Sequence, residues 1–113
     1  MKNETVISKM QMYVQKIFAY VEGMDYEEFI KNDVIVEACV FNLSQLGEIA
    51  NKADTEFQNM HKEIPWRQVY GLRNRIVHDY EGVNLKLVWE IISDDLPMLK
   101  TALAEIKDAW ETI

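Results

Sequence analysis

Apolar residues recur every three or four positions from about Glu4 to Glu22. That spacing places them on one side of a helix, as a wide stripe that faces a core. The stripe consists of Val6, Ile7, Met10, Tyr13, Val14, Ile17, Phe18 and Val21. Gly23 follows directly, and glycine suits the left-handed conformation that ends many helices. The pattern predicts a first long helix that ends before Gly23.

A second long helix is predicted to begin at Asn32 or Asp33, either of which can cap it. One side of this helix would carry Ile35, Ala38, Cys39, Asn42, Leu43, Leu46, Ile49, Ala50 and Ala53. Gly47 lies in the helix interior, where glycine costs about 1 kcal/mol relative to alanine. Its presence there indicates a packing or site-access reason, such as the close approach of another helix.

The segments on either side of this helix are less regular. Asp25 and Glu28 have the spacing of a capping box, so Tyr26 to Lys31 is predicted to form a short helical turn. A polar loop with Phe29 beneath it fits the same residues, and both interpretations stay open. Asp54 to Ile64 loses the periodicity and is predicted to be a connection.

Pro65 suits the first turn of a third helix, which is predicted to run to about His78. Gly82 then marks a turn, and Asn84 can cap a fourth helix. Pro97 cannot sit in an undisturbed helix interior, so the helix either kinks near Asp94 and Asp95 or restarts there. The apolar face continues to the end with Leu99, Leu103, Ile106 and Trp110.

No stretch shows sustained alternation, and the sequence contains no internal repeat. The fold class is therefore predicted to be all-α, an antiparallel bundle of four to five helices. A chain of 113 residues fits a single domain spanning residues 1–113.

The composition indicates a protein of a reducing compartment. The only cysteine, Cys39, cannot form an internal disulfide and lies in an apolar helical stretch, where we interpret it as a core thiol. No apolar run has the length of a signal peptide or a membrane span. We therefore expect a soluble, cytoplasmic protein without a membrane partner.

The net charge of −7 has the wrong sign for a protein that coats nucleic acid. The charge is unevenly distributed, however. Between His61 and His78 four basic residues stand against Glu63 alone, so this segment carries +3 and the rest of the chain −10. Any contact with nucleic acid should therefore be local.

Residues 73–80, RNRIVHDY, combine two guanidiniums, an imidazole and a phenol. These groups suit RNA cleavage, because the imidazole of His78 can move a proton and the guanidinium of Arg73 can bind the scissile phosphate. A basic groove with aromatic faces would hold single-stranded RNA, and its candidate residues are Arg67, Arg75, Tyr70 and Trp66.

On one regular helix Arg73 and His78 would point about 140° apart and could not share a face. Asn74 and His78, four residues apart, could stack, and the amide could then fix the tautomer of the imidazole. A site that uses both Arg73 and His78 needs a frayed helix end or a second copy of the chain across a two-fold axis. We favour the second copy.

Other chemistries are poorly supported. Metal sites are disfavoured because only His61 and His78 are available and no Glu-x-x-His pair exists. Cys39 has no neighbouring histidine that would activate it as a nucleophile. Glycine-rich phosphate loops are absent, and we expect no cofactor.

Arg73, His78 and Tyr80 together resemble the R-x4-H-x-Y signature of HEPN-domain proteins, and specifically of the HepT-like ribonuclease toxins. The likeness covers nearly the whole chain. It includes Leu46-Gly47-Glu48-Ile49-Ala50, Ile64-Pro65-Trp66, Gly71-Leu72-Arg73-Asn74, Val88-Trp89-Glu90-Ile91-Ile92 and Leu96-Pro97.

The resemblance implies a homodimeric, metal-independent endoribonuclease with Arg73 and His78 as catalytic residues, and Asn74 and Arg75 become supporting candidates. It also implies a toxin–antitoxin pair, in which a minimal nucleotidyltransferase antitoxin transfers AMP to Tyr80. One alternative is a catalytically silent HEPN module that binds a nucleotide or a nucleotidyltransferase. Another is a plain helical oligomerisation domain.

Overall fold

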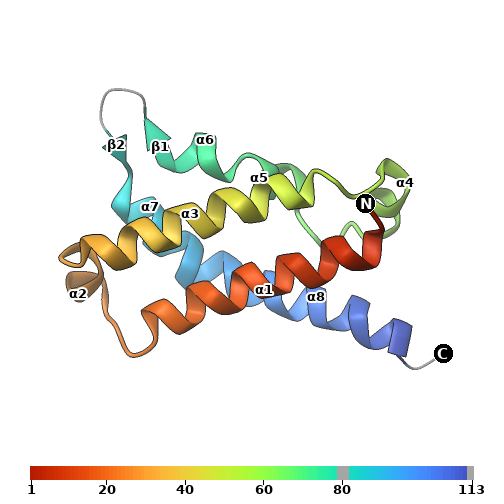
Figure 1. The fold of residues 1–113 in the computed structure, drawn as a ribbon, viewed down its shortest axis with the longest axis horizontal. Coiled ribbons are helices and arrows are strands. Elements are labelled where there is room, and N and C mark those ends of the chain that lie inside the picture. The colour runs from red at the N-terminus through yellow and green to blue at the C-terminus, as the bar shows by residue number, and fades with distance from the viewer. Residues whose placement is uncertain (79–81, 112–113) are drawn as a thin grey trace.

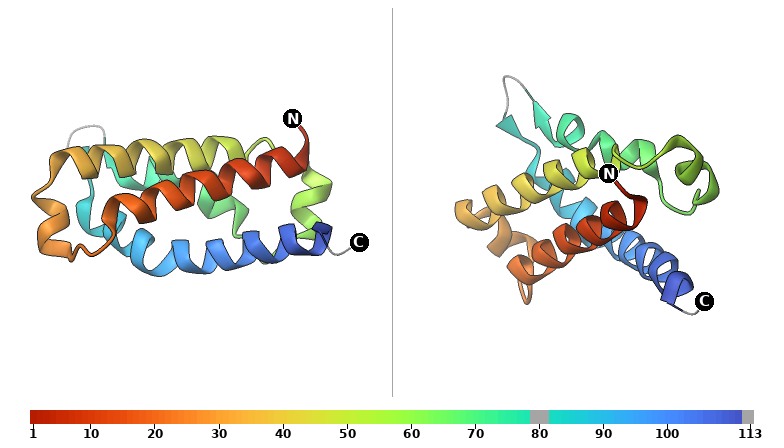
Figure 2. Two further views of the ribbon diagram at one scale, coloured as in Figure 1. Left: turned by 60° about the horizontal axis from the view of Figure 1, so that its bottom comes forward. Right: turned by 45° about the vertical axis from the view of Figure 1, so that its right-hand side comes forward.

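The computed structural model describes residues 1–78 and 82–111, and only the backbone of His78. Its frame consists of three long helices that lie lengthwise beside one another: α1 (Asn3–Val21), α3 (Asp33–Ala50) and α8 (Leu96–Glu111). Helix α1 runs antiparallel to both α3 and α8 (Figures 1 and 2). The predicted stripe of α1 is buried, with Val6, Ile7, Met10 and Ile17 fully enclosed.

A short helix, α2 (Tyr26–Ile30), joins the first two long helices. Gly23 has a φ of +76°, which confirms the predicted end of α1. The capping box is present: the Asp25 carboxylate accepts from the Glu28 amide at 2.8 Å, and the Asp25 amide donates to the Glu28 carboxylate at 3.1 Å. Phe29 is fully buried, with its ring centroid 5.0 Å from that of Trp89. The helical interpretation of this turn is therefore confirmed.

Helix α3 begins as predicted, with the Asn32 side chain accepting from the Ile35 amide at 3.1 Å. Gly47 has a packing reason. A Cβ atom added there would lie 2.7 Å from the carbonyl oxygen of Val69, closer than real Cβ contacts allow. The glycine therefore allows the next part of the chain to lie directly against α3.

The segment from 54 to 64 contains more structure than the predicted connection. It includes α4 (Thr55–Met60), which buries Phe57. The Phe57 ring centroid lies 6.2 Å from Trp66 and 6.1 Å from Trp110, so α4 is held against the last turns of α8. Six residues are too few to show helical periodicity in the sequence, which explains why the helix was not predicted.

The prediction of one continuous helix from Pro65 to about His78 is wrong. The structure has α5 (Trp66–Tyr70), an interruption at Gly71, and α6 (Leu72–Ile76). Strand β1 (Val77–His78) then pairs antiparallel with β2 (Gly82–Val83).

Helical bonding ends at Ile76 because its carbonyl oxygen accepts from the Asn84 amide at 2.8 Å, across the base of the hairpin. Backbone pairing with β2 replaces a further helical turn. Strands of two residues are too short to show sequence alternation, so this hairpin was not predicted either.

After α7 (Leu85–Glu90) the chain passes through a π-helical turn, η1 (Ile91–Asp95), directly into α8. The Leu96 amide donates to the carbonyl of Ile91, five residues earlier. Pro97 lacks an N–H group and its ring would clash with the carbonyl four residues before it, and a wider turn relieves that conflict. The helix therefore changes its geometry near Asp94 and Asp95 instead of restarting with an aspartate cap.

The all-α prediction holds for the body of the chain, with one small hairpin as an addition. The expected four to five helices are exceeded, because several α-helical segments of five or six residues stand between the long ones. Within residues 1–78 and 82–111, no helix has the length and apolarity that crossing a bilayer would require.

Candidate functional site

Helices α5 and α6 form a layer on α3, on the side away from α1 (Figure 1). The two helices carry Arg67, Arg73 and Arg75. Among the residues that the structure describes, none of these guanidiniums forms an ion pair. In an otherwise acidic protein, this layer therefore concentrates positive charge that no described carboxylate neutralises.

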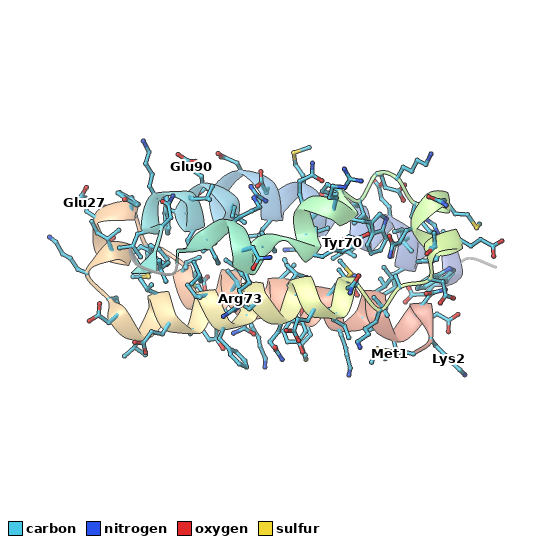
Figure 3. All side chains as sticks on the ribbon, turned by 90° about the horizontal axis from the view of Figure 1, so that it is seen from above. Met1, Lys2, Glu27, Tyr70, Arg73 and Glu90 are labelled. Carbon is cyan, nitrogen blue, oxygen red and sulfur yellow. The ribbon has the colours of Figure 1, made fainter. Side chains whose placement is uncertain are left out.

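Arg73 lies on the exposed surface of α6. Its side chain extends from α6 toward α3 (Figure 3). It makes no hydrogen bond or ion pair with any residue that the structure describes. A guanidinium in this state can bind an incoming phosphate in a bidentate fork without first breaking an internal contact.

His78 does not continue α6, so the 140° separation from Arg73 that a regular helix would impose does not apply. The chain leaves the helix after Ile76, and the His78 backbone pairs with Gly82 in the hairpin. The helix that carries exposed Asn74 ends at Ile76, so the single helix face on which Asn74 was expected to stack on His78 does not reach position 78. Tyr80 and its predicted modification lie outside the described residues.

Asn84 fixes the base of the hairpin that carries His78. Its backbone amide donates to the Ile76 carbonyl at 2.8 Å, while its side-chain oxygen accepts from the Leu87 amide at 3.1 Å and caps α7. The sequence predicted only the cap. The second bond depends on the turn back of the chain at Gly82, whose φ is +75°.

The aromatic candidates differ in their surroundings. Trp66 is only 7% exposed, and its indole N–H donates to the His61 carbonyl at 3.0 Å. Its proposed role as a stacking surface for RNA bases is therefore corrected to one in packing. Tyr70 is 36% exposed and its hydroxyl donates to the Gln58 amide oxygen at 2.6 Å, while Arg67 is exposed.

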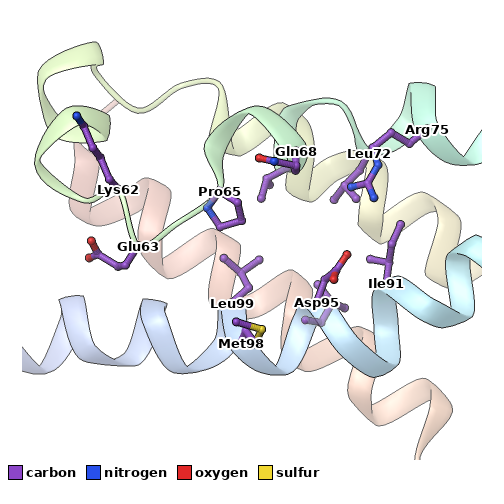
Figure 4. Close-up of a pocket in the computed structure, with 12 residues that line it drawn as sticks. Lys62, Glu63, Pro65, Gln68, Leu72, Arg75, Ile91, Asp95, Met98 and Leu99 are labelled. Carbon is purple, nitrogen blue, oxygen red and sulfur yellow. The ribbon is translucent and has the colours of Figure 1, made fainter.

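Arg75 lines a pocket of about 510 Å³ between the α5–α6 layer and the start of α8. Its guanidinium points across one end of the pocket toward the Asp95 carboxylate (Figure 4). The floor is apolar and includes Val69, Leu72 and Leu99. Arg73 does not line this pocket, because residues two apart on a helix point about 160° away from each other.

Cys39 is fully buried in the core, as predicted. Burial raises the pKa of its thiol to about 12, because desolvation disfavours the thiolate. The group is therefore protonated at neutral pH, which confirms the interpretation as a core thiol and agrees with the expectation that it is no nucleophile.

Comparison with known proteins identifies one family. The sequence model described as "Ribonuclease HepT-like" matches residues 10–106. A protein named "Putative RNase" from Caldanaerobacter subterraneus subsp. tengcongensis is 30% identical over 91% of this chain and 88% of its own length. A protein named "Putative RNase MJ0125" from Methanocaldococcus jannaschii is 33% identical over 88% of the chain and 86% of its own length.

A further relative is named "Probable ribonuclease HepT" and comes from Thermococcus cleftensis. It is 26% identical over 83% of this chain and 86% of its own length. No solved structure gives a significant match.

Proposed function

Because the chain belongs to the ribonuclease HepT-like family, we propose that it is a metal-independent endoribonuclease in which Arg73 and His78 carry out the reaction. The observation that carries the proposal is the exposed guanidinium of Arg73, which no described residue engages, on a short helix that leads directly into the strand of His78. The positive α5–α6 layer supports RNA as the substrate.

The chemistry needs no group beyond the protein and the RNA. The imidazole of His78 takes the proton of a ribose 2′-hydroxyl, and the 2′-oxygen attacks the adjacent phosphorus. The bond to the 5′-oxygen breaks, and the imidazolium of His78 gives its proton to that oxygen as it leaves. The products are a 2′,3′-cyclic phosphate and a 5′-hydroxyl end. Arg73 stabilises the charge that develops on the phosphate oxygens.

A homodimeric, HEPN-like arrangement is part of the proposal. Val34 and Phe41 lie two turns apart on the same side of α3 and are 74% and 62% exposed. Exposed apolar side chains on one helix face are typical of a surface that a partner covers. Light scattering of the purified protein should give twice the mass of the chain, and a monomer would reject this part.

Mixed dimers test whether the site is shared between subunits. In a dimer of one Arg73→Ala chain and one His78→Ala chain, a site that combines residues of both subunits is restored once, and about half of the activity returns. If each subunit contains its own complete site, both sites of this dimer lack one residue and stay inactive. An inactive mixture of separately silent variants would therefore reject sharing.

The chain is further proposed to be the toxin of a toxin–antitoxin pair, neutralised by a minimal nucleotidyltransferase that adenylylates Tyr80. Tyr80 follows His78 by two residues, and a phosphate added there would bring negative charge to the cationic segment that must bind RNA. Intact mass after incubation with such an enzyme and ATP should show added AMP. The Tyr80→Phe variant should stay unmodified, and an adduct on that variant would reject the assignment.

The principal test is cleavage of single-stranded RNA in EDTA. Wild type should cut, and Arg73→Ala and His78→Ala should each lose about 10²- to 10⁴-fold in rate. His61→Gln is the matched histidine control, because His61 pairs with Glu63 and packs on Phe57. Its activity should stay near that of wild type. Undiminished cleavage by His78→Ala would contradict the mechanism, and RNA binding without turnover in wild type would favour the silent module.

A further inference from the structure

Two interruptions of regular helix face each other across one pocket. On one wall, the break at Gly71 separates Val69 from Leu72 and Arg75. On the other wall, the π turn η1 contributes Ile91 and Asp95. Isolated π turns occur frequently at functional sites. The coincidence of both irregularities at a single cavity indicates that the pocket has a role of its own.

Polar groups lie at both ends of this pocket, Lys62 and Glu63 at one and Arg75 and Asp95 at the other (Figure 4). At one end the partly buried guanidinium of Arg75 and the carboxylate of Asp95 point toward one another from opposite walls (Figure 4). They do not form an ion pair, so donors and acceptors of both groups remain for a ligand. The space beside them is bounded by the apolar side chains of Val69, Leu72 and Leu99.

We infer that this pocket binds a guanine base of the RNA, an inference that rests on the proposed ribonuclease function. Guanine presents two adjacent donors, N1–H and the N2 amino group, which the two oxygens of Asp95 can accept. Its O6 and N7 acceptors lie on the adjoining Hoogsteen edge, and an arginine recognises this pair bidentately. Adenine reverses the pattern, with an acceptor at N1 and a donor at N6, and it would oppose both side chains.

The size and lining of the pocket fit an unstacked base. A volume of about 510 Å³ lies within the range of roughly 300 to 1,000 Å³ for small-ligand sites with apolar walls and few polar groups. A base that leaves its stack can lie between apolar side chains while its edge is read by hydrogen bonds. Met98 lines the pocket and is 76% exposed, so a base that enters would cover it.

The pocket and Arg73 lie on different sides of α6. Arg75 and Arg73 point about 160° apart around the helix, so one nucleotide cannot contact both sites in the same way. The guanine would belong to a nucleotide a short distance along the strand from the bond that is cut. Cleavage sites should therefore lie at a constant offset from a guanine.

The test uses uridine-rich RNAs that differ only in one central guanosine or adenosine, bound to the His78→Ala variant so that they stay intact. The guanosine RNA should bind roughly 5- to 150-fold more tightly, the range for one bidentate base contact. Asp95→Asn should abolish or reverse this ratio, because an amide matches adenine instead. Asp94→Asn removes a neighbouring exposed charge of the same π turn and should keep the ratio.

Mapping the cuts made by the protein that retains His78 distinguishes a failure of the guanine assignment from a failure of the ribonuclease proposal. Cleavage at a fixed offset from guanine, lost in Asp95→Asn, supports the inference. Cleavage without base preference overturns the pocket assignment and leaves the ribonuclease proposal standing. Absence of cleavage under every condition overturns the ribonuclease proposal. Binding of free GMP that matches or exceeds the guanosine RNA overturns the assignment of an RNA base in favour of a nucleotide site.

Discussion

The bundle of α1, α3 and α8 and the outer segment of α5, α6, β1 and β2 differ in how their sequences specify structure. In the bundle, long apolar stripes produce long helices, and the buried side chains are nearly all hydrocarbon. The outer segment is broken into pieces of two to five residues and carries every arginine of the chain. Stability should therefore depend mainly on the bundle, and activity on the outer segment.

The substitutions with the largest expected effects should change either stability or activity, but not both. Leu103→Ala removes a fully buried side chain of α8 and should lower the free energy of unfolding by about 2–5 kcal/mol. Arg73→Ala should change it by no more than about 0.5 kcal/mol, since the side chain is exposed and has no described partner. Urea unfolding measures the stability of each variant, and RNA cleavage measures its activity. Strong destabilisation by Arg73→Ala would show that the arginine serves the fold.

Gly47→Ala tests the contact between the two regions. The added Cβ would lie 2.7 Å from the Val69 carbonyl, and overpacking of this kind costs about 1–3 kcal/mol. This exceeds the gain of about 1 kcal/mol in helix propensity. Because α5 must move away from α3, RNA cleavage should fall as well. Glu48→Ala, at an exposed neighbouring position, is the control, and equal stability of both variants would contradict the packing argument.

Cys39 allows a pH test of the bundle core. Its folded pKa of about 12 lies above the ordinary value of 9.0, so folding favours the protonated thiol. The stability of the fold therefore contains a contribution from the protonated thiol, which is complete below pH 9 and is lost as the pH rises from 9 toward 12. The slope in this window is about 1.4 kcal/mol per pH unit. Chemical denaturation should show a shallower pH dependence for Cys39→Ala, and parallel curves would contradict the assignment.

The smallest expected effects concern two asparagine caps, one in the bundle and one at the base of the hairpin. Asn32 and Asn84 each accept from a backbone amide at 3.1 Å, at the starts of α3 and α7. Replacing either by alanine should cost about 0.5–2 kcal/mol. Only Asn84→Ala should also reduce cleavage, because loss of the cap loosens the residue whose backbone amide holds the base of the hairpin of His78. Equal activities of the two variants at a temperature where both are folded would reject this positioning role.

The bundle could be predicted from the sequence because the same apolar pattern recurs along its long helices. Many turns of α1 show the same apolar side, and the Asn32 and Asp25 caps have specific local chemistry. Gly47 was correctly expected to have a reason, although the sequence could not name Val69 as its neighbour.

The outer segment could not be predicted because its signals are short or contradictory. The apolar spacing of Val69, Leu72 and Ile76 continues through Gly71 as if one helix persisted. Its end depends on the Asn84 amide, a partner eight residues beyond Ile76. The candidate Arg73 was found from its residue type and spacing. The arrangement of Arg75 and Asp95 across one pocket could be found only in the tertiary structure, because the two residues are distant in sequence.

The central claim is that the ribose 2′-oxygen attacks the adjacent phosphorus and displaces the 5′-oxygen, while His78 takes the 2′-hydroxyl proton and Arg73 binds the phosphate. The most direct test compares, in EDTA, an RNA with a single 2′-deoxy substitution at the mapped cut site with the all-ribose RNA. We predict no cleavage at the substituted position, and a 2′,3′-cyclic phosphate with a 5′-hydroxyl end from the all-ribose RNA. Cleavage of the substituted RNA at an unchanged rate would contradict it.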